Sequence, residues 1–152
     1  MLLDSGLLLS VLQLEGNLAQ HLVELIMTGS PQDLVNKGGL VEMVAGLEIL
    51  RNKPCVQRQK MFYWEKSGNS IAEIDYLDTF HLKVTPIEIK SGTQGGMKSL
   101  WQFMREKRLT EAIRCSFENF GEFTYTDPQA DNAERHITII PLYALDNLRE
   151  MK

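Results

Sequence analysis

The spacing of apolar residues along this chain of 152 residues changes from a helical to a strand-like period near residue 61. Before that point, leucine, isoleucine and valine recur at the three- and four-residue steps typical of helices, over residues 6–28 and 37–52. Beyond it, short aromatic and β-branched runs predict strands. This change of period favours an α/β protein in which helices flank a sheet.

The second half of the chain alternates predicted strands with helices. Residues 124–135 are polar and predict a loop. Residues 1–36 are interpreted as an N-terminal helical extension, and residues 37–152 as one domain with a mixed sheet. Strands are predicted at residues 61–64, 71–77, 84–90, 112–117 and 137–140. In addition to the two helical stretches above, helices are predicted at residues 97–108 and 142–151.

Composition excludes several classes of protein. The 16 basic and 20 acidic residues give a net charge of −4, so the chain is not a basic nucleic-acid coat protein. Two cysteines are too few for a disulfide framework. The longest apolar run falls short of the roughly 20 residues that cross a bilayer. We therefore expect a soluble cytoplasmic protein without a membrane partner.

The candidate chemistry lies in two neighbouring predicted strands. In the strand at 84–90, Glu88 and Lys90 share one face, and isoleucines occupy the other. Strict alternation divides the strand at 71–77 into two faces: Ile71, Glu73, Asp75 and Leu77 lie on one, and Ala72, Ile74 and Tyr76 on the other.

If these two strands pair, Asp75 lies beside Glu88 and Lys90. Two carboxylates and a backbone carbonyl, such as that of Ile89, form an oxygen site suited to Mg²⁺ or Mn²⁺. A metal there would activate water and stabilise charge on a phosphate, and Lys90 would hold the attacking water. The structural alternative is that Glu88 and Lys90 form an exposed ion pair, worth about 0–1 kcal/mol.

Asp75 followed by Pro86-Ile87-Glu88-Ile89-Lys90 resembles the active-site pattern of the PD-(D/E)XK nuclease superfamily. That superfamily has a restriction-endonuclease-like fold, whose order of helix, three strands, helix and strand agrees with the predicted elements. The chain also resembles the domain of unknown function at the C-terminus of prokaryotic AAA-family ATP-binding proteins. The stretches that carry this second resemblance are residues 3–8, 39–44, 63–64, 73–76, 87–92, 99–100 with 103, and 139–142.

The resemblance implies a metal-dependent nuclease that hydrolyses phosphodiesters. Asp75 and Glu88 would bind Mg²⁺ or Mn²⁺, and Lys90 would activate water. Glu42, on the helix before the strands, would reach the metal directly or through water, and its structural alternative is a solvated helix flank. Glu73 could orient a ligand, although a structural role is the favoured interpretation. The implied partners are nucleic acid, with DNA foremost, and an AAA-family ATPase module.

A second function remains open from sequence. The same fold could serve as a non-catalytic interaction module of an ATPase, which the acidic net charge favours. The basic residues Arg105, Lys107 and Arg108 are interpreted as charges that complement a helix dipole. The aromatic run of Phe62, Tyr63 and Trp64 is expected in the core of a strand rather than on a base-stacking surface.

Overall fold

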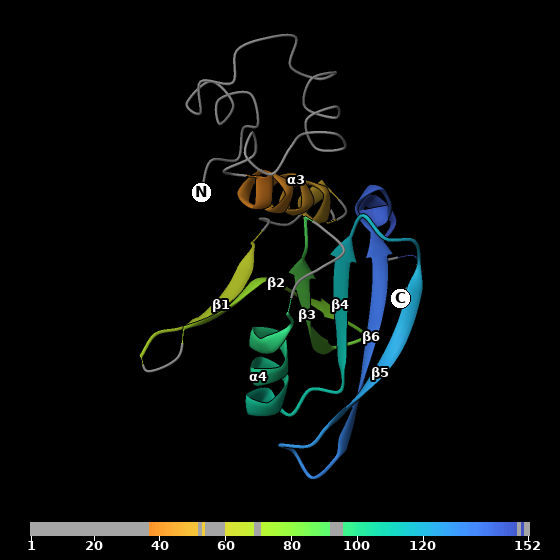
Figure 1. Cartoon of the computed structure of the whole chain (residues 1–152). Coiled ribbons are helices and arrows are strands. Elements are labelled where there is room, and N and C mark those ends of the chain that lie inside the picture. Colours follow the sequence, from red (N-terminus) through yellow and green to blue (C-terminus); the bar gives the residue numbers. More distant parts are fainter. Residues whose placement is uncertain are drawn as a thin grey trace, which may run out of the picture.

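The computed structural model describes residues 37–51, 53, 60–68, 71–91, 96–148 and 150. Within these ranges, a six-stranded mixed sheet packs against helices, which confirms the expected α/β class (Figure 1). The predicted extension at residues 1–36 lies outside the described residues. In chain order the elements are α3 (Lys37–Arg51), β1 (Phe62–Lys66), β2 (Ala72–Phe80), β3 (Lys83–Ile89), α4 (Lys98–Lys107), β4 (Glu111–Ser116), β5 (Gly121–Asp127), β6 (Ala133–Pro141) and the 3-10 helix η1 (Leu142–Asn147).

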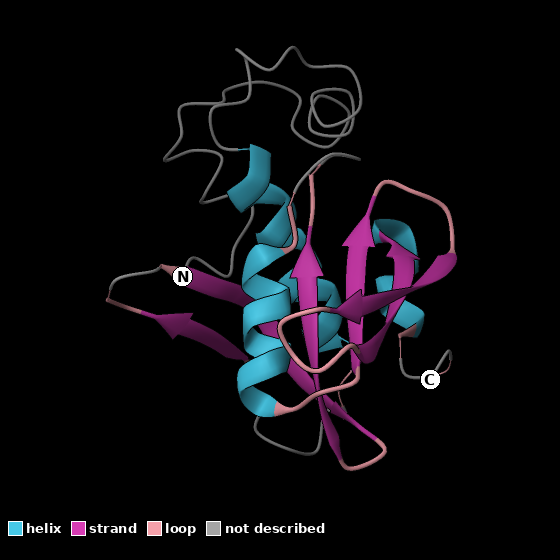
Figure 2. Cartoon of the chain, turned by 60° about the horizontal axis from the view of Figure 1, so that its bottom comes forward, coloured by secondary structure: helices cyan, strands magenta, loops and turns pink. Residues whose placement is uncertain are grey.

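The sheet has the strand order β1-β2-β3-β4-β6-β5. β3, β4 and β6 run parallel to one another at its centre. The antiparallel β1–β2 and β5–β6 hairpins flank this centre, and Figure 2 shows the β1–β2 hairpin projecting to one side of the remaining strands. The carboxyl ends of the three parallel strands therefore meet at one edge, where α/β sheets commonly bind ligands.

Two hydrophobic clusters hold the helices to the sheet. α4 presents buried residues at helical spacing, namely Leu100, Phe103 and Met104, to Ile74, Ala112 and Ile137. α3 and η1 belong to the other cluster, whose buried members are Val41, Ala45, Ile49, Tyr76, Phe80, Ile87, Ile89, Ile113, Cys115, Ile140, Ala144, Leu145 and Leu148. None of the helices in the described ranges is long and apolar enough to cross a membrane.

The prediction of a loop at residues 124–135 is wrong. This stretch contains the end of β5, a tight turn and the start of β6. β5 is an edge strand whose residues before Asp127 are mostly polar and exposed, with only Phe123 and Tyr125 partly buried among them, so its composition resembles that of a loop. Asp131 and Asn132 form the turn with φ values of 51° and 58°, a left-handed conformation that these two residue types tolerate. The predicted C-terminal helix at 142–151 is shorter in the structure, as η1.

The predicted faces of β2 are also corrected. β2 pairs with β1 through Trp64–Ile74 and Phe62–Leu77, so two residues of β2 oppose one residue of β1. This extra residue is a β-bulge, which shifts the alternation of side chains. Ile74 consequently packs with α4 and Tyr76 with α3, although strict alternation placed both on one face.

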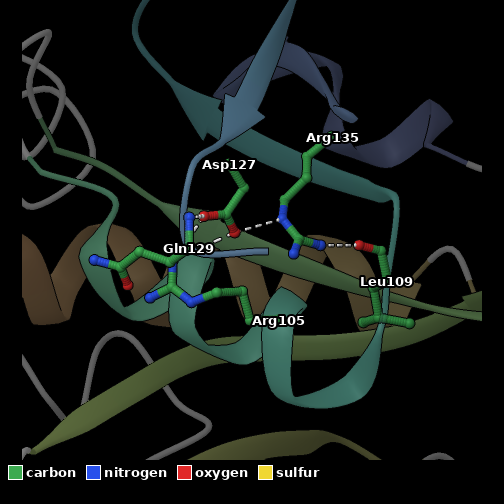
Figure 3. Close-up of polar contacts among 5 residues, drawn as sticks. All are labelled: Arg105, Leu109, Asp127, Gln129 and Arg135. Carbon is green, nitrogen blue, oxygen red and sulfur yellow. Dashed lines mark hydrogen bonds and ion pairs between the residues drawn. The ribbon is translucent and has the colours of Figure 1, made fainter. Parts of the chain in front are cut away.

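A buried charge network fixes α4 on the β5–β6 hairpin (Figure 3). Asp127 is fully buried and accepts hydrogen bonds from Arg105 Nη1 at 3.2 Å and Arg135 Nε at 3.0 Å. Arg135 Nη1 also donates to the carbonyl oxygen of Leu109 at 2.5 Å. Burial acts to raise the pKa of Asp127, but bonds from Arg135, the Gln129 N–H and Arg105 outweigh it and hold the pKa below its ordinary value.

Candidate functional site

The structure brings together the carboxylates of β2 and β3 that the sequence singled out. β2 and β3 pair antiparallel through Tyr76 and Ile87, so the next residues along the two strands, Asp75 and Glu88, are neighbours. Asp75 is also one of the two residues in the bulge. Bulges commonly redirect side chains beside functional sites, and here the bulge sets the orientation of Asp75.

Hydrogen bonds fix three members of this cluster. The Ile89 N–H donates to Asp75 Oδ2 at 2.7 Å. Lys90 Nζ lies 2.5 Å from Glu88 Oε1. The Lys90 N–H donates to the carbonyl oxygen of Cys115 at 2.8 Å, which continues the β3–β4 pairing past the end of β3.

Glu88 is buried rather than part of a surface ion pair. Only 5% of the residue is exposed, and its Oε2 atom has no hydrogen-bond partner among the described residues. An unpartnered buried carboxylate oxygen is costly, because it has lost its contacts with water. The geometry therefore differs from the exposed Glu88–Lys90 pair that was the structural alternative.

Burial and mutual repulsion raise the pKa values of these carboxyl groups. Burial and then the charge of Glu88 raise the pKa of Asp75 to about 7, against the lowering effect of the Ile89 N–H. Burial also raises the pKa of Glu88, although its hydrogen bond with Lys90 opposes that shift. Without a cation, the cluster therefore favours a protonated carboxyl group near neutral pH.

Glu42 and Glu73 belong to the same cluster. Burial, followed by repulsion from Glu73 and Glu88, raises the pKa of Glu42, and the charge of Lys90 lowers it. α3 thus places Glu42 within electrostatic range of the strand carboxylates. Glu73 is exposed on β2 and also raises the pKa of Glu88.

Tyr76 anchors α3 beside the cluster. Its hydroxyl donates to the carbonyl oxygen of Glu42 at 2.8 Å. Burial, together with the charges of Asp75 and Glu42, raises the pKa of Tyr76 to about 12, so the hydroxyl stays protonated. Gly46 provides the space for this ring, since a Cβ atom there would lie 2.6 Å from the Tyr76 hydroxyl oxygen.

Sequence reasoning missed Arg114, a buried arginine next to Glu88. It pairs with Glu88 in the parallel register of β3 and β4, and its charge lowers the pKa of Glu88. Its Nη2 atom lies 3.2 Å from Glu118 Oε2, and its Nη1 atom lies 3.8 Å from Met97 Sδ. A charged residue inside the apolar run of β4 was the available signal.

The three aromatic residues of β1 divide between core and surface. Trp64 packs against Phe103 with a ring separation of 5.0 Å, as expected for a core residue. Phe62 and Tyr63 are 56% and 66% exposed, which corrects the prediction that all three are core residues. β1 is at the edge of the sheet formed by the described residues, so it has a paired strand on one side only.

The cluster offers few ligands for a metal. Within the described ranges, no three carboxylate, imidazole or thiol side chains are arranged to hold a metal ion by themselves. Mg²⁺ does not require such a set, because it commonly binds one or two carboxylates and keeps several waters. The unpartnered Oε2 atom of Glu88, a residue whose charge raises the pKa of Asp75, fits a site of this sparse kind.

Comparisons with known proteins identify a family. Residues 37–145 match the family model described as Domain of unknown function (DUF4143). No curated protein and no solved structure matches the chain. Because the match spans well over half of the sequence, the chain belongs to the DUF4143 family.

Proposed function

We propose that this member of the DUF4143 family is a metal-dependent nuclease that hydrolyses phosphodiesters. The observation that carries the proposal is the meeting of Asp75, Glu88 and Lys90 where β2 and β3 lie side by side. Glu88 is buried with one unpartnered oxygen, Asp75 is hydrogen-bonded beside it, and Lys90 contacts Glu88 directly. A purely structural ion pair between Glu88 and Lys90 does not require a second, half-buried carboxylate beside it.

The proposed metal is Mg²⁺ or Mn²⁺. Asp75, Glu88 and the carbonyl oxygen of Ile89 would hold it, with Glu42 acting directly or through water. These are hard oxygen ligands, which both ions prefer. Burial, and after it repulsion between the carboxylates, raises the pKa values of Asp75, Glu88 and Glu42, and a bound cation would offset both effects, which supports the assignment.

When bound, such a metal supplies an activated water and neutralises charge on a phosphate. Lys90 can donate hydrogen bonds to the attacking water or to a phosphate oxygen, because its ammonium group lies at the cluster and is partly exposed. The Ile89 N–H holds the Asp75 carboxylate in place. Arg114 adds a fixed positive charge behind Glu88.

The proposal extends to fold family and partners. The order of α3, three strands, α4 and β4 agrees with a restriction-endonuclease-like core of the PD-(D/E)XK type. On this basis the substrate would be nucleic acid, with DNA foremost, and the domain would act together with an AAA-family ATPase module. These assignments follow from the resemblance of the motif residues.

A second candidate is a non-catalytic interaction module of an ATPase. Lys90 already neutralises Glu88 without a metal, and the chain has a net charge of −4. Both features suit a domain that has kept the fold and lost the reaction. The two candidates differ in their expected activity. The nuclease should cleave nucleic acid and lose that activity when Lys90 is replaced, whereas the interaction module should not cleave at all.

The test compares cleavage of single- and double-stranded DNA and RNA with Mn²⁺ or Mg²⁺ present. Lys90→Ala should lower the cleavage rate by about 100-fold or more, as expected when a donor to the reacting groups is removed. Asp75→Asn should also lose turnover. The matched control is Lys66→Ala, which removes an exposed lysine of β1 paired with Glu106 and should leave cleavage unchanged.

Equal cleavage by the wild type and Lys90→Ala would place the activity at another site or in a contaminant. Absence of cleavage by the wild type, even with the ATPase module supplied, would favour the interaction module.

A further inference from the structure

A second polar cluster lies on β4, the strand next to the candidate active site. Arg114 and Ser116, here called the β4 donor pair, are two residues apart on this strand, so their side chains lie on the same face of the sheet. Both contact Oε2 of Glu118: Ser116 Oγ donates to it at 3.0 Å, and Arg114 Nη2 lies 3.2 Å from it. The chemistry proposed above uses Arg114 only as a fixed charge and gives Ser116 and Glu118 no role.

The register of the sheet places the β4 donor pair directly beside the candidate active site. Glu88 and Arg114 are partners in the parallel pairing of β3 with β4. The Lys90 N–H then donates to the carbonyl oxygen of Cys115, which continues the pairing toward Ser116. Neighbouring strands are about 4.8 Å apart, so a group bound to the β4 donor pair would lie next to Glu88 and Lys90.

The chemistry of the β4 donor pair suits a phosphate group. A guanidinium group donates hydrogen bonds to an oxyanion in a planar fork, and a serine hydroxyl adds a further donor. In the structure a carboxylate already occupies this position, since one oxygen atom of Glu118 contacts both members of the pair. Carboxylate and phosphate oxygens accept the same kinds of hydrogen bond, so Glu118 stands where a phosphate oxygen would bind.

A comparison with another buried arginine separates Glu118 from a permanent counter-charge. Arg135 pairs with Asp127, whose side chain is fully buried, so this pair cannot open without disturbing the core. Glu118 instead follows β4 in the short loop before β5, and 32% of its side chain is exposed. It can therefore move into water, whereas the side chain of Arg114 is only 10% exposed and would need another anion in its place.

We propose that Arg114 and Ser116 bind a phosphate group of the substrate beside the one that is cleaved, and that Glu118 occupies this subsite until the substrate displaces it. The inference rests on the proposed nuclease function and adds to it a phosphate subsite with an autoinhibitory contact. It also supplies local affinity in a chain whose net charge is −4, because displacement of Glu118 exposes the charge of Arg114 to the substrate.

The first measurement tests the subsite without nucleic acid or metal. Inorganic phosphate is titrated into ¹⁵N-labelled protein at constant ionic strength with a chelator, and the amide shifts of residues 114–118 report the dissociation constant. Glu118→Ala should tighten phosphate binding by about 10- to 100-fold, the effect of removing one competing hydrogen bond between charged groups. Glu118→Gln keeps the length of the side chain and should give a smaller gain in the same direction.

The matched control is Glu122→Ala, because Glu122 is an exposed glutamate of β5 and its loss changes the net charge equally. It should leave the dissociation constant unchanged. Two further variants are made in the Glu118→Ala background. Ser116→Ala removes one donor and should lose part of the gain. Arg114→Lys keeps the charge but not the planar fork, and it should lose more.

The second measurement uses an oligonucleotide that the wild type cleaves in Mn²⁺. Glu118→Ala should lower KM several-fold and leave kcat within about two-fold, because the subsite binds a phosphate that does not react. Glu122→Ala should change neither constant.

The two measurements distinguish failure of the subsite from failure of the nuclease. Equal phosphate affinity of Glu118→Ala and the wild type, or an equal gain in Glu122→Ala, would reject the subsite, while cleavage by the wild type would still support the nuclease. A gain that survives both Ser116→Ala and Arg114→Lys would also reject it, because phosphate would then bind elsewhere. A gain that depends on the β4 donor pair, without cleavage by any protein, would keep the phosphate subsite and reject the nuclease.

Discussion

At the scale of single residues, Asp75 shows most directly how burial disfavours a charged carboxylate. Its pKa is raised to about 7 in the folded chain, against about 3.9 for an unfolded aspartate. A carboxyl group with a raised folded pKa contributes its full stabilisation below its unfolded pKa. That contribution is lost as the pH rises through the folded pKa.

We therefore expect Asp75→Asn to become increasingly more stable than the wild type as the pH rises from about 4 to about 7.5 without metal. Asparagine remains neutral and can still accept the Ile89 N–H bond. The gain should reach roughly 1–3 kcal/mol in the free energy of unfolding, measured with urea in the presence of a chelator. Glu65→Gln, an exposed change on β1, is the control. Parallel pH profiles for Asp75→Asn and the wild type would contradict the account.

Gly46 gives a second prediction at this scale. An alanine Cβ there would meet the Tyr76 hydroxyl and Met61 Cε at 2.6 and 2.8 Å, so the ring must move and its bond to Glu42 is lost. Gly46→Ala should lower the free energy of unfolding by about 1–3 kcal/mol, despite the better helix propensity of alanine.

The matched control lies in the same helix. A Cβ atom at Gly39 would have no neighbour within 4 Å among the described residues, so Gly39→Ala should instead raise stability by up to about 1 kcal/mol. Thermal unfolding of both variants decides the matter. Similar effects of the two substitutions would show that the contact with Tyr76 is unimportant.

Single residues of the cluster could be predicted because their pattern is local. Glu88 and Lys90 share a strand face by simple alternation, and Asp75 lies on the adjacent strand. Arg114 could not be found this way, because its place beside Glu88 depends on the parallel pairing of β3 with β4 across an intervening helix. Tyr76 was likewise hidden, since its partner is a backbone carbonyl of α3.

At the scale of elements, the attachment of α4 to the β5–β6 hairpin depends on Asp127. Replacing it by asparagine leaves Arg105 and Arg135 without their counter-charge, and Arg135 is buried. Asp127→Asn should lower the free energy of unfolding by about 3 kcal/mol, the cost of breaking a buried ion pair from one side. Glu106→Gln, which alters an exposed pair of the same helix, should have little effect. Urea unfolding that ranks the two variants equally would contradict this role.

Elements with a strong apolar period were predicted well, and those defined by pairing were not. The helices at 37–52 and 97–108 agree with α3 and α4 because buried residues recur along one side of each. β5 was missed because most of its residues are exposed at the edge of the sheet, so no apolar run marks it in the sequence. The bulge in β2 was missed because it arises from the register with β1, which no pattern within β2 encodes.

At the scale of the whole molecule, the domain boundary is open to a direct test. The family match begins at residue 37, where α3 begins. A fragment of residues 37–152 should therefore unfold cooperatively, with a melting temperature within a few degrees of the full chain. Loss of a cooperative transition would show that residues 1–36 are part of the folded unit rather than an extension of it.

Divalent cations should stabilise the whole domain. Mn²⁺ that binds only the folded chain raises its melting temperature by mass action. The shift should increase with Mn²⁺ concentration and disappear in Asp75→Asn, whereas Glu65→Gln should keep it. A shift of equal size in Asp75→Asn would locate the cation elsewhere.

The central claim is that Asp75 and Glu88 hold a divalent cation. The most direct measurement is an anomalous difference map from crystals grown with Mn²⁺, recorded near the manganese absorption edge. We predict a peak between the carboxylates of Asp75 and Glu88, beside the carbonyl of Ile89, and its absence in Asp75→Asn crystals. Wild-type crystals in millimolar Mn²⁺ with no peak at that position, and Lys90 still paired with Glu88, would contradict the claim.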